Sequence, residues 1–338
     1  MDLEILLPIF KQADIVEATL NSVKRALISD VAVTLTVLDD NYPEDQVEIK
    51  ATREILSSYE NLMSINYEKS ESNLGYVEAM RNLYRRSSNE HIMYLAGDDL
   101  INRKFFVNIV QAYQAGAMFT SRSFYMFENN PTNITRMVPP MWDSNGLFEL
   151  NSLSPRDLDI LMFSLSQLSG LTFNKSLVNE GIGPHVFTAH VYPVIEIAQV
   201  APGYYFNEPQ IMCRQESSQT RFIKKIYEPS PTVQWKTLID TKVKDKNLTK
   251  IMSARYANNF VGLNQIFLYS GRWKALLELR EMAKIDRSIL CNFRILLVFI
   301  LLFLPRKIVR IISNKAKIIG YIRLRKQLAL FPSIKDFE

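Results

Sequence analysis

The sequence has few of the residues that build disulfide frameworks or zinc sites. Its 338 residues include two cysteines, Cys213 and Cys291, and three histidines. Cysteines that far apart, with so few histidines, give neither a disulfide scaffold nor a Cys/His zinc site, so a reducing compartment is expected. The first ten residues contain two acids and have the pattern of a strand, so a secretory signal with a positive leading region is not expected.

Acidic residues are missing from one long stretch near the C-terminus. No acid lies between Asp286 and Asp336, although residues 287–335 hold eleven of the 40 Lys and Arg residues. The rest of the chain has 29 bases against 35 acids, so the net charge of +5 comes from this stretch alone. A basic segment attached to an acidic body indicates an anionic surface beneath the segment, and it argues against nucleic acid bound along the whole molecule.

The chain also lacks an apolar run long enough to cross a membrane. Residues 295–304 are ten uninterrupted apolar residues, and a helix of that length is shorter than a hydrocarbon core of about 30 Å. Pro305 ends the run, and isoleucines then recur among the bases of residues 306–326. The pattern predicts a basic amphipathic tail at residues 291–338 that lies on a membrane surface; a packed helix with a solvated basic face is the alternative.

The first third of the chain alternates between strand and helix patterns. Short apolar runs end at polar clusters, and segments with apolar residues three and four apart follow them. The predicted strands are residues 3–10, 31–38, 63–67 and 91–95, and the predicted helices are residues 13–26, 47–59, 76–86 and 105–113. This alternation predicts an α/β fold with a mostly parallel central sheet, in which ligands bind beyond the carboxyl ends of the strands.

The remaining two thirds have a different composition. Residues 113–219 are richer in Pro, Gly, Asn and Ser, which predicts loops and shorter strands around an acceptor pocket. Helical patterns follow at residues 235–243, 248–269 and 272–282. The expected division is a main domain at 1–225, made of residues 1–120 and 121–225, then a helical extension at 226–290 and the tail at 291–338.

Two adjacent carboxylates, Asp98 and Asp99, come directly after the predicted strand at residues 91–95. Magnesium and manganese prefer oxygen ligands, and proteins hold Mg²⁺ with one or two carboxylates together with substrate phosphates. The pair therefore suits a Mg²⁺ or Mn²⁺ site. A turn in which Asp caps the next helix is the alternative.

Four motifs in order carry a resemblance to a known family. They are the opening strand with Leu6, Pro8 and Phe10, the cluster Asp39-Asp40-Asn41, the segment from Asn73 through Gly75 to Asn82, and the turn Gly97-Asp98-Asp99. Their order and spacing resemble the family-two glycosyltransferases of GT-A fold. The resemblance covers residues 1–120, and the position before the acidic pair, often a further Asp in that family, is Ala96 or Gly97 here.

The resemblance implies that residues 1–225 are a catalytic GT-A domain, in which residues 1–120 bind the nucleotide sugar and residues 121–225 form the acceptor side. It also implies roles for single residues in the donor site. Asp40, with Asp39 as the alternative, is the expected reader of the nucleotide base, and Asp98 with Asp99 is the expected metal and diphosphate site. The further donor-site residues that it implies are Pro8, Phe10, Asn73, Gly75 and Arg214. Each has a simpler reading as a turn, helix-entry or surface residue.

The general base of the reaction has no clear motif in this sequence. In the resembling family it is an acid, commonly in a Glu-Asp pair, and no such pair occurs between residues 150 and 210. The candidates are Glu180, His185, His190 and Glu196. His190 is near the centre of the segment where the family carries its base, and its ordinary pKa is close to neutral; a core or surface histidine is the alternative.

The resemblance implies an enzyme of the hexosyltransferase type that inverts the anomeric centre. The expected donor is a nucleotide sugar, with a deoxyhexose among the candidates. A basic tail suits a lipid-linked acceptor, such as a polyprenyl-diphosphate oligosaccharide of O-antigen, lipopolysaccharide or capsule assembly, at the cytoplasmic face of the inner membrane. A sugar-1-phosphate nucleotidyltransferase and a non-catalytic membrane-bound partner with a decayed donor site are the alternatives.

Overall fold

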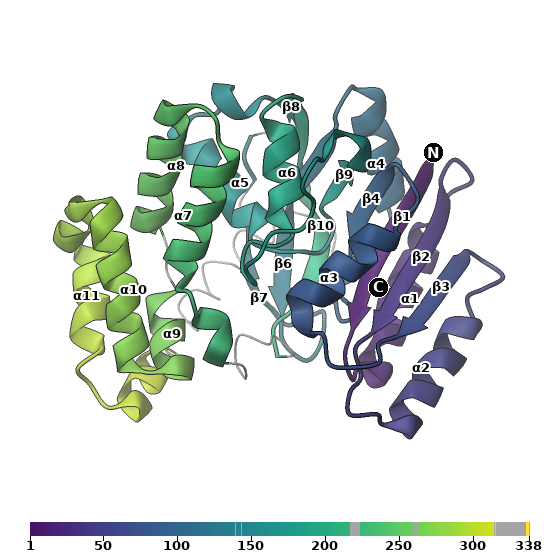
Figure 1. Ribbon diagram of the computed structural model, residues 1–338, viewed down its shortest axis with the longest axis horizontal. Coiled ribbons are helices and arrows are strands. Elements are labelled where there is room, and N and C mark those ends of the chain that lie inside the picture. The colour runs from purple at the N-terminus through teal and green to yellow at the C-terminus, as the bar shows by residue number, and fades with distance from the viewer. Residues whose placement is uncertain are drawn as a thin grey trace.

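The computed structural model describes residues 1–338 apart from 139, 143, 217–223, 260–261, 314, 316–335 and 338. A mixed sheet runs through the molecule in the strand order β3-β2-β1-β4-β9-β6-β10-β5, with β7 paired to β6 and β8 paired to β10. Helices α3 and α6 lie in front of the sheet in Figure 1, and α7 to α11 form a helical region at one end of the molecule. The fold is therefore α/β with a C-terminal helical part, as the sequence predicts.

The first third alternates strand and helix along the chain. Its elements are β1 (Asp2–Ile9), α1 (Ala13–Ala26), β2 (Ala32–Asp39), α2 (Gln46–Ser57), β3 (Ser64–Lys69), α3 (Gly75–Arg86) and β4 (His91–Tyr94). Strands β3, β2, β1 and β4 pair in parallel. The predicted strands and helices of this part are confirmed to within about two residues, and their parallel arrangement brings the carboxyl ends of β1, β2 and β4 to one edge.

The second third is more regular than the sequence predicts. Its elements are β5 (Leu100–Ile101), α4 (Phe105–Gln114), β6 (Phe119–Phe127), β7 (Ile134–Met137), β8 (Gly146–Phe148), α5 (Pro155–Leu165), β9 (Thr172–Asn174), α6 (Val191–Ala198) and β10 (Gly203–Arg214). The prediction of loops and short strands over residues 113–219 is wrong at β6 and β10, because these are long strands that pair in parallel. Buried on both faces, they lack the polar–apolar alternation that marks a half-exposed strand.

The last third is helical. It contains α7 (Pro231–Lys242), α8 (Lys246–Asn259), α9 (Leu263–Ser270), α10 (Arg272–Ile285) and α11 (Phe293–Leu301). The single helix predicted over residues 248–269 is wrong, since α8 and α9 are separate helices. Helix α7 contacts α6, and α8 contacts α5, so this region packs directly on the sheet-bearing part.

Candidate functional site

The two acidic loops predicted for the donor site lie on either side of the end of β1. The amide of Asp40, just after β2, donates to the carbonyl of Ile9 over 2.9 Å. On the other side of β1 the amide of Leu95 donates to the carbonyl of Leu6 over 3.1 Å, and the turn with Asp98 follows. The two loops therefore share one edge of the sheet, which is where a doubly wound fold binds its ligand.

Gly97 allows the acidic turn to approach β1 closely. A Cβ atom at this position would lie 2.7 Å from Cγ2 of Ile9 and 2.5 Å from Oε1 of Gln12. Carbon atoms in proteins do not pack at that separation, so only glycine permits the observed approach. The sequence Gly97-Asp98-Asp99 thus fixes the distance between the turn and the end of β1.

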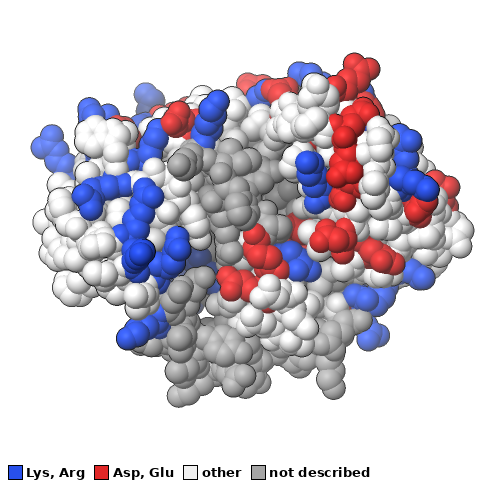
Figure 2. Space-filling model, turned by 90° about the horizontal axis from the view of Figure 1, so that it is seen from below, with Lys and Arg blue, Asp and Glu red and all other residues white. Residues whose placement is uncertain are grey.

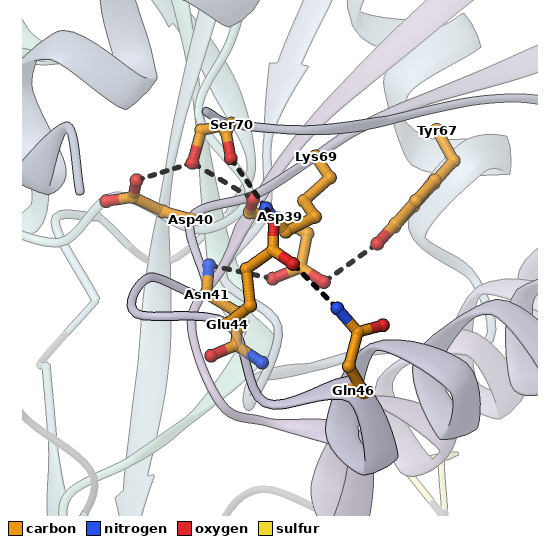
Figure 3. A network of polar contacts seen from close by, with 8 residues as sticks. All are labelled: Asp39, Asp40, Asn41, Glu44, Gln46, Tyr67, Lys69 and Ser70. Atoms are coloured by element: carbon orange, nitrogen blue, oxygen red, sulfur yellow. Dashed lines mark hydrogen bonds and ion pairs between the residues drawn. The ribbon is translucent and has the colours of Figure 1, made fainter. Parts of the chain in front are cut away.

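The Asp40 carboxylate organises the start of α3. Its Oδ1 accepts hydrogen bonds from the Ser70 hydroxyl at 2.9 Å and the Leu74 amide at 2.7 Å, and its Oδ2 accepts one from the Gly75 amide at 2.8 Å. The bond to Ser70 is visible in Figure 3. Gly75 has φ of +68°, a conformation in which glycine is favoured. Asp40 therefore joins the second and third motifs of the resemblance into one structure.

Asp39 faces the neighbouring strand. Its carboxylate accepts from the Tyr67 hydroxyl at 2.9 Å and from the Asn41 amide at 3.1 Å (Figure 3). Burial raises the pKa of Asp39 above its ordinary value, although both hydrogen bonds oppose the shift. The side chain thus holds the loop after β2 against β3, in a position that the sequence pattern does not reveal.

Asp99 is the most tightly held carboxylate of the site. Its Oδ2 accepts from the Ser169 hydroxyl at 2.6 Å and from Nε2 of Gln167 at 3.0 Å, and its Oδ1 accepts from the backbone amide of Arg214 at 2.8 Å. Burial, followed by the negative charge of Asp98, raises the pKa of Asp99 to about 7. Asp99 therefore ties the acidic turn to the 167–169 loop and to the end of β10.

The acidic pair suits a divalent cation that takes its other ligands from the substrate. Asp98 and Asp99 are adjacent in the turn, and the three hydrogen bonds that Asp99 accepts hold the pair in place. Among the described residues no group of three or more His, Cys, Asp or Glu side chains gathers into a metal site. One or two carboxylates are enough for Mg²⁺ that is also bound to phosphates, so the residues present fit a cation that arrives with a diphosphate.

A buried arginine lies next to this acidic turn. The Arg122 guanidinium donates to the carbonyls of Ser164 at 3.3 Å and Gln167 at 2.9 Å, and also to that of Ser169. Burial lowers the pKa of Arg122 to about 10, so it stays cationic at neutral pH. It shapes the loop whose side chains hold Asp99, and its positive charge interacts with the Asp99 carboxylate. No local pattern in the sequence marks Arg122, Gln167 or Ser169.

His190 is buried between the donor half and the acceptor half. Its Nδ1 lies 2.9 Å from the Tyr76 hydroxyl, and its Nε2 lies 3.0 Å from the Leu165 carbonyl. Because a carbonyl only accepts, Nε2 carries the proton and Nδ1 accepts from Tyr76. Burial lowers the pKa of His190 to about 4. Both nitrogens have protein partners here, and the role of His190 as the base stays a prediction.

The lowered pKa of His190 should make the stability of the protein depend on pH. An unfolded histidine titrates near 6.5, so between about pH 6.5 and 4 the unfolded chain binds more protons, and the free energy of unfolding falls as the pH falls. The shift to about 4 corresponds to a loss of about 3 kcal/mol at most. Glutamine is an uncharged hydrogen-bond donor and acceptor, so the His190→Gln variant should lack this fall in the free energy of unfolding, measured by urea unfolding at several pH values. Retention of the wild-type slope by the variant would contradict the assignment. Burial also lowers the pKa of the half-buried His185, so His185→Gln is the comparison and should keep the part of the slope that is due to His190.

The other candidate residues have more exposed positions. Glu180 is exposed and forms an ion pair of 2.8 Å with Lys242, and Glu196 forms one of 2.9 Å with the same lysine. The Arg214 guanidinium lies over the Phe127 ring and pairs with Glu216 at 2.8 Å. Their predicted catalytic and diphosphate roles therefore stay predictions.

Three further predicted donor-site residues lie around the same edge of the sheet. Pro8 pairs with Leu38 inside β1, Phe10 is partly exposed just beyond this strand, and Asn73 is exposed immediately before α3. Their binding roles likewise stay predictions.

Comparison with known proteins gives one family and a set of similar folds. Residues 4–162 match the model of the family described as glycosyl transferase family 2. Residues 1–349 of S. aureus TarS in complex with UDP align with a TM-score of 0.60 at 12% identity, over 87% of this chain and 91% of that one. The same protein with UDP-GlcNAc gives 0.61 at 12% identity, over 86% and 83%. Comparison with curated proteins finds no match.

Proposed function

Since residues 4–162 belong to glycosyl transferase family 2, on a GT-A fold, we propose that this glycosyltransferase moves a sugar from a nucleotide donor to a lipid-linked acceptor at an anionic membrane surface. The proposed acceptor is a polyprenyl-diphosphate oligosaccharide of O-antigen, lipopolysaccharide or capsule assembly, at the cytoplasmic face of the inner membrane. The proposed stereochemical outcome is inversion, and a deoxyhexose is one candidate sugar.

One observation carries the donor part of the proposal. The loop with Asp40 and the turn with Asp98 lie on either side of Ile9, at the carboxyl end of the sheet. A nucleoside diphosphate bound at this edge would place its base near Asp40 and its phosphates near Asp98. The S. aureus structures contain UDP and UDP-GlcNAc, so uridine diphosphate sugars come first among the donors to test.

The chemistry follows from the charge that develops as the bond to the diphosphate breaks. A divalent cation, when bound, acts as a Lewis acid on the leaving phosphate. Asp98 would hold that cation, and Asp99 would fix the turn through its bonds to Ser169 and the Arg214 amide. A base on the acceptor side must take the proton of the attacking hydroxyl, and His190 and Glu180 are the proposed candidates.

The first test is protection of the folded protein by nucleotide sugars. Unfolding temperature would be measured with UDP, GDP, dTDP and CMP sugars, each with and without Mn²⁺. Binding at 100 times the dissociation constant stabilises the folded state by about 2.7 kcal/mol, so we expect one nucleotide class to raise the temperature and the cation to enhance its effect. Protection only by a nucleoside triphosphate with a sugar 1-phosphate would favour the nucleotidyltransferase instead. No protection by any of them would favour the non-catalytic partner.

The membrane part of the proposal depends on which apolar side chains of α11 and the residues after it are buried and which are exposed to solvent. Three side chains spaced by seven residues are buried against the rest of the protein: Ile295 in this helix, Leu302 just after it, and Val309. The rest of the same segment exposes large apolar side chains to solvent: Leu290, Phe293, Leu296, Leu297, Phe299, Ile300, Phe303, Ile308, Ile311 and Ile312. An apolar helical face left open to water is typical of a surface that binds another apolar phase. No described helix is long and apolar enough to cross a bilayer.

Basic side chains accompany this apolar surface. Arg287, Arg306, Lys307, Arg310 and Lys315 are all exposed. Figure 2 shows Lys and Arg side chains spread over the half of the visible face that belongs to the C-terminal helices, with most acidic side chains on the other half. Exposed apolar groups bordered by bases complement an anionic bilayer, which supports a lipid-linked acceptor.

A further inference from the structure

The last described residues of the chain pack on the catalytic domain. The Asp336 carbonyl accepts a 2.9 Å hydrogen bond from the Arg103 amide, just before α4. The Phe337 carbonyl accepts one of 2.8 Å from the Arg25 guanidinium of α1, and the Phe337 side chain is 1% exposed. The prediction that the membrane-associating tail extends over all of residues 291–338 is therefore wrong at its end, because Asp336 and Phe337 belong to the surface of the catalytic domain.

Phe337 completes a small apolar cluster that is separate from the main core. The other buried members come from β5, β6, β7 and β10: Leu100, Tyr125, Phe127, Ile134 and Met212. The Phe337 and Tyr125 rings meet edge to face, with centroids 6.2 Å apart. Aromatic pairs of this kind are stabilising, and a cluster so small depends on each member. Phe337 thus closes a cluster built on strands from different parts of the sequence.

This cluster lies directly against the residues that hold Asp99. Leu100 follows Asp99 in the chain and pairs with Met212 in the two-residue ladder between β5 and β10. Two residues further along β10, the Arg214 amide donates to Asp99, and the Arg214 guanidinium lies 4.9 Å from the Phe127 ring centroid. A two-residue ladder is weak by itself, so its register depends on the side chains that cover it.

We propose that Phe337 is a positioning residue for the diphosphate end of the donor site. It keeps β5 against β10, and through that pairing it keeps Asp99 and the adjacent Asp98 at the edge of the sheet where the phosphates bind. The identity of the ligand in this inference rests on the proposed function. The contacts of Phe337 do not depend on it. It assigns the C-terminus to the donor site, where the sequence pattern assigns it to the membrane.

The test compares Phe337→Ala and Phe337→Leu, with Trp273→Ala as a control at an aromatic side chain that is 71% exposed. A displacement of about 1 Å in a binding constellation costs up to about 100-fold, so we expect Phe337→Ala to raise the KM for the nucleotide sugar about tenfold. Phe337→Leu should recover most of the loss because it refills the cluster, whereas Trp273→Ala should leave the KM unchanged. A KM that stays at the wild-type value in folded Phe337→Ala would overturn the proposal.

Hydrogen exchange tests the positioning role of Phe337 independently of the proposed function. The Arg214 amide, which donates to Asp99, should exchange at least about tenfold faster in Phe337→Ala, while the amides between β1 and β2 keep their protection. This measurement needs no ligand, so it remains decisive if no nucleotide sugar binds the wild-type protein. Equal acceleration at both places would mean a general loss of stability and would also overturn the proposal.

Discussion

Replacement of Asp98 by Asn is expected to lower kcat by about 10²–10³, equivalent to about 3–4 kcal/mol of transition-state stabilisation. The amide has the shape of the carboxylate but no charge, so it holds a divalent cation poorly and leaves the developing phosphate charge without compensation. The fold should change little, since the Asp and Asn side chains have the same size. The measurement is single-turnover transfer from the donor identified by thermal protection, at several Mn²⁺ concentrations.

Two further variants test whether the loss of transfer comes specifically from the Asp98 charge. Asp240→Asn removes an exposed carboxylate on α7 that pairs with Lys236, so transfer should stay at the wild-type rate. Asp99→Asn should reduce both stability and transfer, because an amide cannot accept all three hydrogen bonds that the Asp99 carboxylate receives. If Asp98→Asn kept wild-type kcat and wild-type dependence on Mn²⁺, the acidic turn would not be the diphosphate site.

The donor half could be predicted from sequence because its signals are local. Apolar periodicity locates β1, β2 and β4, and a parallel sheet brings their carboxyl ends to one edge. Asp40 and Asp98 follow such ends directly, so their proximity needs no knowledge of side-chain contacts. The role of Gly97 also comes from a local pattern, although the reason for it, close approach to Ile9, appears only in the structure.

The parts that could not be predicted depend on partners distant in sequence. Ser169 holds Asp99 from 70 positions away, and Tyr76 meets His190 across 114 positions. Arg122 has the pattern of an ordinary strand residue, yet its cation is buried against backbone carbonyls. The apolar periodicity of a single sequence predicts whether a segment is a helix or a strand, but not which segments lie next to it. Strand pairing and the partners of polar side chains therefore cannot be predicted from it. The same limit explains why Phe337 is assigned to the tail.

The triple variant Lys307→Gln, Arg310→Gln and Lys315→Gln is expected to weaken binding to anionic vesicles by about 100-fold. Each base near an anionic surface contributes about 1 kcal/mol, so three contribute about 3 kcal/mol. All three are exposed, and so is the apolar surface beside them. The measurement is flotation with vesicles of equal parts phosphatidylglycerol and phosphatidylcholine, compared with pure phosphatidylcholine and repeated at high salt, which should weaken the electrostatic part.

The matched control removes the same charge elsewhere. Lys24, Lys50 and Lys104 are exposed bases of the catalytic domain, and their change to Gln should leave vesicle binding near the wild-type level.

Phe293→Ser with Phe303→Ser should weaken binding to both vesicle types, because the apolar contribution does not depend on lipid charge. An equal loss in the two triple variants would assign the effect to net charge alone. Normal vesicle binding by Phe293→Ser with Phe303→Ser, together with loss of a dimer in sedimentation, would mean that the apolar surface joins two copies of this chain.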